Sequence, residues 1–326
     1  MKRIKFKKYA GLKIVGKVAQ QPVNFESSHL DRASWLTAEV ESGGKFGTVM
    51  NFDGTGMTAG LHQAIAVYPR YLDDEKINND QGPLWKLLNR MRLLAYDSIT
   101  LLRIFDRLYD FGWYLAEDAT LRYTGNGDIV DGKGIRDRLT GSRDGVMPLK
   151  GNDRAIAEEV IKLFHEAFSD HKTFEAQIAF GKEHFIKRAE RTNLRFCKKT
   201  THKRYRIMDV LYDPEFHMTH PESLPWDCKE MDLADAMFWS NTVNAPGAAL
   251  KVLCKVVDAG GRPKDFYTVR KFAKELIHAL GTSSYGRWDD DIKNGRYQRT
   301  RKAAMQVWPK EFFTGPSAIM PKDLEG

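Results

Sequence analysis

Hydrophobic residues recur at helical spacing along most of this chain, and the first such segment leads into a stretch with a different pattern. Its periodic positions are Leu30, Ala33, Leu36, Thr37 and Val40. Ser28 with Asp31 three residues later resembles a capping box, and the pair Gly43-Gly44 is typical of a helix end. The pattern therefore predicts a helix that begins after Ser28 and ends near Glu41.

The next segment changes to strand-forming residues. Residues 45–58 contain Phe46, Val49 and Phe52, and Asp53-Gly54 is a strong hairpin signal. We expect a β-hairpin here. A second helix is expected from about Ala59 until Pro69, because apolar residues return at wider spacing.

Helical spacing then dominates the rest of the chain. Residues 83–115 form the longest such pattern, and apolar residues cover more than one face, so we expect a helix that is mostly buried in the core. Residues 122–151, rich in Gly and Asp, predict loops or a small hairpin. Further helices are expected over 153–168, 174–191, 231–257 with a break at V-N-A-P-G, 267–280 and about 297–307. The basic first 26 residues are consistent with a strand or a loosely docked arm.

Composition narrows the class of partner. The chain has 326 residues, with 51 Lys and Arg against 43 Asp and Glu, and a net charge of +8. A positive balance favours an anionic partner such as nucleic acid, membrane or bacterial cell wall. No segment reaches the roughly 20 apolar residues of a membrane span, and no secretory signal is seen, so we expect no stable membrane insertion. We expect the protein to be made and held in a cytoplasm.

Metal and cofactor signals are weak. The three cysteines lack C-x-x-C spacing and are odd in number, so we expect buried thiols rather than a zinc site or a disulfide framework. D-I-V-D-G-K-G (128–134) has carboxylates spaced as in a calcium loop but no closing Glu, and His217 and His220 lack a clear third ligand. The sequence predicts no metal and no cofactor.

The stretch from Trp35 to Gln63 concentrates the chemically capable groups. Glycoside cleavage needs a protonated carboxylic acid at the leaving oxygen, and often a second carboxylate for water. Glu41 suits the first role, because the negative end of a helix dipole disfavours an ionised carboxylate. Asp53 and Thr58, on the hairpin, could hold and deprotonate a water, although Asp53 could also be simply the first residue of a turn.

These segments resemble the lysozyme-like superfamily, which includes goose-type and phage lysozymes, lytic transglycosylases and chitosanases. Glu41-Ser42 and Gly60-Leu61-His62-Gln63 are similar to the transglycosylase Glu-Ser and G-L-M-Q segments, with His62 in place of Met. Asp53 to Gly60, D-G-T-G-M-T-A-G, is similar to the D-G-R-G-Y-T-x-G segment of chitosanases.

The resemblance implies roles for these residues. Glu41 would be the general acid, Asp53 the candidate base and Thr58 a water-positioning hydroxyl, and Ser42, His62 and Gln63 would contact substrate. Downstream, Val243 to Ala248, V-N-A-P-G-A, is similar to the transglycosylase A-Y-N-A-G-P-G segment and adds Asn244 to the substrate-binding set. Tyr297 and residues 299–301 are more weakly similar to the R-E-T-R-x-Y segment of the same domains.

We therefore expect a mainly α, lysozyme-like α+β fold: two helical lobes with a small β-hairpin subregion beside the active-site helix. The expected domains are a basic N-terminal arm over 1–27 and one catalytic domain over 28–326, with a large helical insertion around 70–230.

The function expected is cleavage of the β-1,4 backbone of peptidoglycan by a monomeric phage endolysin or virion-associated lysin. It would stay in the host cytoplasm until release to the wall, or belong to the virion. The sequence leaves hydrolysis and lytic transglycosylation open. A chitosanase-like hydrolase is a second enzyme reading, less suited to the positive charge, since chitosan is cationic. A non-catalytic wall-binding or nucleic-acid-binding protein, using the basic run 197–206, is the alternative outside enzymes; a nucleic-acid partner is not our expectation.

Overall fold

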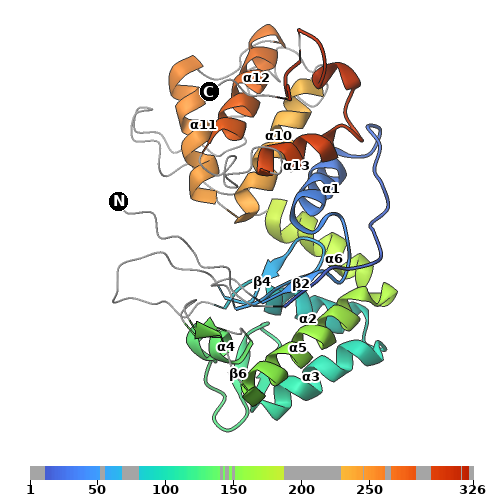
Figure 1. The fold of residues 1–326 in the computed structure, drawn as a ribbon, viewed down its shortest axis with the longest axis vertical. Coiled ribbons are helices and arrows are strands. Elements are labelled where there is room, and N and C mark those ends of the chain that lie inside the picture. The colour runs from blue at the N-terminus through green and yellow to red at the C-terminus, as the bar shows by residue number, and fades with distance from the viewer. Residues whose placement is uncertain are drawn as a thin grey trace. The chain divides into compact units, whose positions relative to one another are not determined.

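The computed structural model divides the chain into two compact units (Figure 1). Unit 1 comprises Met1–Gln20 and Glu41–Phe180, and unit 2 comprises Gln21–Val40 and Gly181–Gly326. The residues that the structure describes are 12–51, 56–67, 81–139, 142–143, 147–148, 151–186, 229–244, 246–260, 266–283, 295–316 and 318–322. Helices make up most of both units in these ranges, and the strands are short. The predicted mainly α architecture with a small β subregion is confirmed.

Helix α1 (His29–Ser42) forms where the sequence predicts it. The Ser28 hydroxyl accepts a hydrogen bond from the Asp31 backbone N–H at 3.1 Å and donates one to the Asp31 carboxylate at 2.6 Å. At the other end, Gly43 and Gly44 adopt φ values of +68° and +66°, which are left-handed conformations that favour glycine. The capping serine and the two glycines therefore fix where α1 begins and ends.

Unit 1 contains a four-stranded antiparallel sheet. Its strands lie in the order β1 (Lys13–Ile14), β2 (Val49–Met50), β3 (Thr58–Ala59) and β4 (Ala64–Ile65). Met50 pairs with Thr58, so the chain folds back as the predicted hairpin requires. The Asp53-Gly54 turn itself lies outside the described residues. Of the two alternatives for the N-terminal segment, a strand or a loosely docked arm, β1 matches the strand.

The helix predicted from Ala59 to Pro69 is wrong. Residues 60–63 form a turn, and the chain then returns antiparallel as β4, with Thr58 opposite Ile65. Gly60 and Gln63 have φ values of +84° and +51°, which an α-helix does not accommodate. The apolar positions of this segment therefore face the core from a sheet rather than from a helix.

Gly60 should be intolerant of a side chain. A Cβ at this position would lie 2.8 Å from ring atoms of Phe168, on backbone that L residues rarely adopt. We expect Gly60→Ala to lower the free energy of unfolding by about 2–4 kcal/mol, through left-handed strain and overpacking together. Gly43→Ala is the control, because its φ is also positive but nothing lies within 4 Å of the new Cβ. Equal losses in urea unfolding for the two variants would contradict the steric part of this explanation.

The single long helix predicted over 83–115 is also wrong. The segment contains α2 (Leu84–Leu94), α3 (Ile99–Asp110) and the strand β5 (Trp113–Leu115). Ser98 interrupts the helix, because its hydroxyl accepts from the Leu101 N–H at 3.2 Å and donates to the Asp170 carboxylate at 2.5 Å. The expected burial holds for one face only, since Leu93 and Ile99 are 69% and 75% exposed.

The Gly- and Asp-rich region forms more structure than the sequence suggests. Strand β5 pairs with β6 (Leu121–Tyr123) in a hairpin, and β7 (Ser142–Arg143) pairs with β8 (Met147–Pro148). Between them lies α4 (Gly132–Leu139), which the sequence analysis did not predict. Its start is capped by Asp131, whose carboxylate accepts from the Gly134 N–H at 2.6 Å. One carboxylate of the D-I-V-D-G-K-G segment therefore caps a helix.

The remaining elements of unit 1 are helical. They are α5 (Gly151–Ser169), the short 3-10 helix η1 (His171–Thr173) and α6 (Phe174–Phe180). The predicted helix over 153–168 is confirmed. That over 174–191 begins as α6 and continues as the π-helix η2 (Gly181–Ile186), and its last residues lie outside the described part.

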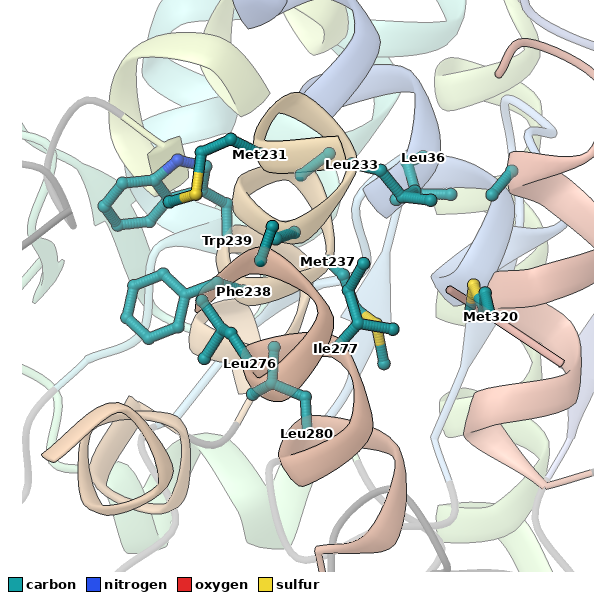
Figure 2. Close-up of a cluster of buried hydrophobic side chains, with 14 of the residues drawn as sticks. Leu36, Met231, Leu233, Met237, Phe238, Trp239, Leu276, Ile277, Leu280 and Met320 are labelled. Carbon is teal, nitrogen blue, oxygen red and sulfur yellow. The ribbon is translucent and has the colours of Figure 1, made fainter. Parts of the chain in front are cut away.

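Unit 2 is organised around α10 (Lys229–Asn244), which is buried on nearly all sides. It packs against α11 (Pro246–Gly260) and α12 (Phe266–Thr282), while α13 (Arg296–Ala304) and η4 (Lys310–Phe312) follow. Figure 2 shows side chains of this core, including Leu36, Phe238 and Leu276. The helices predicted over 231–257, 267–280 and 297–307 are confirmed, with the predicted break before Pro246.

A charged cluster lies inside this apolar unit. The Asp232 carboxylate is fully buried and accepts hydrogen bonds from Arg32 Nε at 2.9 Å, Arg32 Nη2 at 2.5 Å, His29 Nδ1 at 2.6 Å and Trp308 Nε1 at 2.8 Å. Arg32 also donates to the backbone carbonyls of Phe25 and Ser27. These bonds attach the first turn of α1 to α10.

The cluster makes the stability of the protein depend on pH. Burial alone would lower the pKa of His29, but the hydrogen bond with Asp232 and the charges of Asp232 and Asp235 raise it above 6.5. Burial would raise the pKa of Asp232, but the bonds from His29 and Arg32 lower it below 3.8. Stability from Asp232 is therefore lost as pH falls below about 4, and stability from His29 is lost as pH rises above about 6.5.

We expect His29→Gln to have a lower free energy of unfolding than wild type. The difference should be largest between about pH 4 and pH 6.5. The margin should shrink as pH rises through the raised pKa of His29. Urea unfolding of both proteins at about pH 5.5 and pH 9 measures this difference. An identical margin at the two pH values would mean that His29 is not charged in the folded protein.

Two further expectations bear on the chain as a whole. Cys254, in α11, is disulfide-bonded, so the expectation of three free thiols is wrong for this residue. Among the described residues, none of the helices combines the length and apolar content needed to cross a membrane.

The two units do not have the bounds of the predicted arm and catalytic domain. The chain passes between units after Gln20, after Val40 and after Phe180. Residues 12–20 extend the sheet of unit 1, whereas Phe25 and Ser27 bond to Arg32 in unit 2. That one catalytic domain spans both units stays a prediction.

Candidate functional site

Glu41 is the next-to-last residue of α1 and the first residue of the main segment of unit 1. Its side chain is half-buried. Because it lies in the last turn, the unpaired carbonyl groups of the helix end place partial negative charge near its carboxyl group.

Ser42 fixes the end of the helix that carries Glu41. The Ser42 hydroxyl donates to the Leu61 carbonyl at 2.7 Å and accepts from the Lys45 N–H at 3.2 Å. Ser42 is buried, with 7% of its surface exposed. It was predicted to contact substrate, and its hydroxyl proton is instead engaged with the turn between β3 and β4.

Helix α6 holds the turn between β3 and β4. The Leu61 N–H donates to Gln177 Oε1 at 3.0 Å, and Gln177 Nε2 donates to the Phe168 carbonyl at 2.9 Å and to the Thr173 hydroxyl at 3.1 Å. These three hydrogen bonds are buried, so the turn is a rigid support. Glu41 is therefore followed by backbone that is fixed from two directions.

Thr58 and Gln63 lie together at the two ends of the turn between β3 and β4. The Thr58 hydroxyl donates to Gln63 Oε1 at 2.9 Å, while Gln63 Nε2 donates to the carbonyls of Thr48 at 2.9 Å and Gly60 at 2.8 Å. Both side chains are 4% exposed. Gln63 thus uses its amide to hold the hairpin, and the Thr58 hydroxyl retains only its acceptor capacity for a water.

Comparison with protein-family models, with curated proteins and with solved structures found no match to this chain.

Of the other three predicted site residues, the structure describes the side chain of one. His62 follows Leu61 in the turn and is 4% exposed. Asp53 lies outside the described residues. Asn244 is the last residue of α10, and its side chain is outside the described part. His217, His220 and the basic run 197–206 also fall outside it. Within the described ranges, no group of three or more His, Cys, Asp or Glu side chains could hold a metal ion.

The support of the site includes residues that sequence reasoning missed. Gln177 lies 116 residues from Leu61 in the chain, and His165 Nδ1 lies 2.6 Å from the Gly47 carbonyl across 118 residues. A Cβ at Gly47 would lie 1.9 Å from the Ser169 hydroxyl, so glycine is required there by close approach to α5. No local pattern signals such contacts, although Gln177 inside an otherwise apolar helix face is the one hint.

The Thr58–Gln63 bond predicts a loss of stability on removal of the hydroxyl. Thr58→Val keeps the shape of the side chain but leaves buried Gln63 Oε1 without its donor. We expect the free energy of unfolding to fall by about 1–3 kcal/mol, the cost of an unsatisfied buried acceptor. Thr58→Ser, which keeps the hydroxyl, is the matched control in thermal and urea unfolding. If valine is tolerated as well as serine, the bond contributes nothing to the hairpin.

Proposed function

We propose that this protein cleaves the β-1,4 glycosidic backbone of peptidoglycan, with Glu41 as the general acid. The observation that carries the proposal is the placement of Glu41: a half-buried carboxylic acid at the end of α1, next to a serine that ties the helix to the hairpin turn. A general acid must be held in place beside the bond that it protonates, and the hydrogen bonds of Ser42 fix the backbone next to Glu41.

The proposed reaction begins with proton transfer from Glu41 to the glycosidic oxygen. The bond between that oxygen and the sugar C1 breaks, and positive charge develops at C1 and the ring oxygen. In hydrolysis a water attacks C1 and gives its proton to a base, for which Asp53 is our candidate. In lytic transglycosylation the C6 hydroxyl of the same sugar attacks C1, and its proton goes to the Glu41 carboxylate. Both routes remain part of the proposal.

Charge supports the choice of substrate. A net charge of +8 attracts an anionic, peptidoglycan-coated surface and repels a cationic polymer such as chitosan. We accordingly place peptidoglycan before chitosan. The proposal extends to a lysin that is held in a host cytoplasm until release, or carried in a virion.

Mass spectrometry of the products tests this function. Purified sacculi treated with the wild-type protein should release muropeptides with broken glycan strands. Reducing ends would indicate hydrolysis, and 1,6-anhydro ends would indicate transglycosylation. Intact sacculi after prolonged treatment, with no soluble muropeptides, would contradict the proposed function.

A further inference from the structure

A hollow of about 520 Å³ lies against the β5–β6 hairpin in unit 1. None of the residues proposed for catalysis lines it. Its polar lining comes from Arg92 of α2 and from Tyr114, Glu117, Asp118 and Arg122 of the hairpin. The volume falls within the range of small-molecule sites in proteins, about 300–1,000 Å³.

The hairpin turns one face toward this hollow. Tyr114 and Arg122 are directly opposite each other on neighbouring strands, so their side chains share one face. The residues that flank Tyr114, Trp113 and Leu115, are buried with 3% and 5% exposure, whereas Tyr114 is 40% exposed. The alternation of the strand therefore presents an aromatic ring and a guanidinium group on the same surface.

Two polar groups of the hollow, Asp118 and Arg122, are already fixed in place. The Asp118 carboxylate accepts from the Thr120 hydroxyl at 2.5 Å, the Thr120 N–H at 3.0 Å and Arg122 Nη2 at 2.9 Å. The Thr120 hydroxyl and Arg122 lower the pKa of Asp118 to about 2, so it is ionised at neutral pH. Arg122 is further held by the Gly127 carbonyl at 3.0 Å.

Arg92 completes this frame from α2. Its guanidinium donates to the Leu115 carbonyl at 2.9 Å and to Asn89 Oδ1 at 2.6 Å. A guanidinium carries five N–H donors, so Arg92 and Arg122 each keep donors beyond these contacts. Their planar groups need little further ordering when a ligand arrives.

The charges of the lining balance. Two arginines face two carboxylates, so the hollow favours a ligand that is uncharged and rich in hydrogen-bonding groups. A pyranose ring meets both conditions: its C–H face packs on an aromatic ring, and its hydroxyl and N-acetyl groups bond to fixed polar side chains. An anionic ligand would meet Glu117 and Asp118, and a cationic one would meet the two arginines.

We propose that this hollow binds an N-acetylated sugar unit of a glycan strand, as a second contact apart from the Glu41 site. As a contact to peptidoglycan, this inference rests on the proposed function. It gives a role to part of the region around residues 70–230, which we expect to be an insertion in the catalytic domain.

The test is titration of the full-length protein with a soluble N-acetylglucosamine hexamer, followed by backbone amide NMR. Glu41→Gln is used as the background, so that the hexamer is not cleaved during the titration. We expect the hexamer to shift the amide signals of Tyr114, Leu115 and Arg122. Tyr114→Thr should raise the dissociation constant measured from the hairpin signals about tenfold. Threonine keeps the strand propensity of the position.

Tyr123→Thr is the matched control, because Tyr123 lies on the same hairpin with 37% exposure and does not line the hollow. It should bind the hexamer as the background protein does. No shift in the hairpin, or equal affinity for Tyr114→Thr and the background protein, would overturn the inference. Shifts of the hairpin signals with a peptidoglycan stem peptide, and none with the hexamer, would also overturn the inference.

The two proposals fail separately. Cleavage of sacculi by wild type without hairpin binding would remove only the second contact. Hairpin binding of the hexamer, with no cleavage of sacculi, would leave a sugar-binding protein and remove the proposed catalytic function.

Discussion

Replacing Glu41 by glutamine is expected to lower the rate of cell-wall lysis by about 10²- to 10⁴-fold, the usual contribution of a general acid. Glutamine has the same shape as glutamic acid but cannot donate a proton to a leaving oxygen. The initial rate of turbidity loss of outer-membrane-permeabilised cells measures the effect. Folding should be preserved, since removing a carboxylate from a helix end changes stability by only about 1 kcal/mol or less.

Glu39→Gln is the matched control for this variant. Glu39 lies on the same helix, two residues earlier, and is also half-buried. Residues two apart on a helix do not share a face, so Glu39 should not reach the bond that Glu41 protonates. Lysis by Glu39→Gln should therefore stay near the wild-type rate. Equal loss in the two variants would indicate a general effect of charge rather than a catalytic role of Glu41.

Replacing Asp232 by alanine is expected to lower the free energy of unfolding by about 3–5 kcal/mol. The cost is large because the charged Arg32 and His29 would remain buried without their shared carboxylate. Trp308 would also lose its acceptor. A loss of this size is a large fraction of the 5–15 kcal/mol that stabilises a typical protein. Urea unfolding, followed by circular dichroism at about pH 6, measures it.

Asp97→Ala is the control for Asp232→Ala. Asp97 also pairs with a cation, Lys172, at 2.6 Å, but the pair lies at the surface. Exposed ion pairs contribute little because water and salt screen them, so this variant should unfold at nearly the wild-type urea concentration. If Asp97→Ala were as damaging as Asp232→Ala, burial of the Asp232 cluster would not explain its importance.

The sequence predicted the parts of the structure that local chemistry determines. Ser28 with Asp31, and Gly43 with Gly44, specify the two ends of α1 through bonds and backbone angles within a few residues of each end. The amphipathic spacing of α5 and α12 reflects which face each helix buries. These signals need no knowledge of distant segments.

The sequence failed where distant contacts decide between alternatives. Leu61 and Ile65 have a spacing that fits a helix, but pairing of Thr58 with Ile65 and the bond from Leu61 to Gln177 select a turn and a strand. The long helix over 83–115 likewise breaks at Ser98, whose bond to Asp170 spans 72 residues. A window of ten to fifteen residues contains neither Gln177 nor Asp170.

The candidate site was predicted unevenly for the same reason. The position of Glu41 at a helix end follows from local signals and is seen in the structure. The roles of Ser42, Thr58 and Gln63 depend on their partners, and those partners are backbone carbonyls and one another rather than an open groove. We therefore place these three residues in the support of the site, and Glu41 remains the proposed reactive group.

The most direct test of the central claim is the release of soluble muropeptides from purified sacculi by wild type and Glu41→Gln at equal concentration. We expect release by wild type and almost none by the variant, with both proteins unfolding at similar urea concentrations. Equal release by the two proteins would contradict the assignment of Glu41 as the general acid.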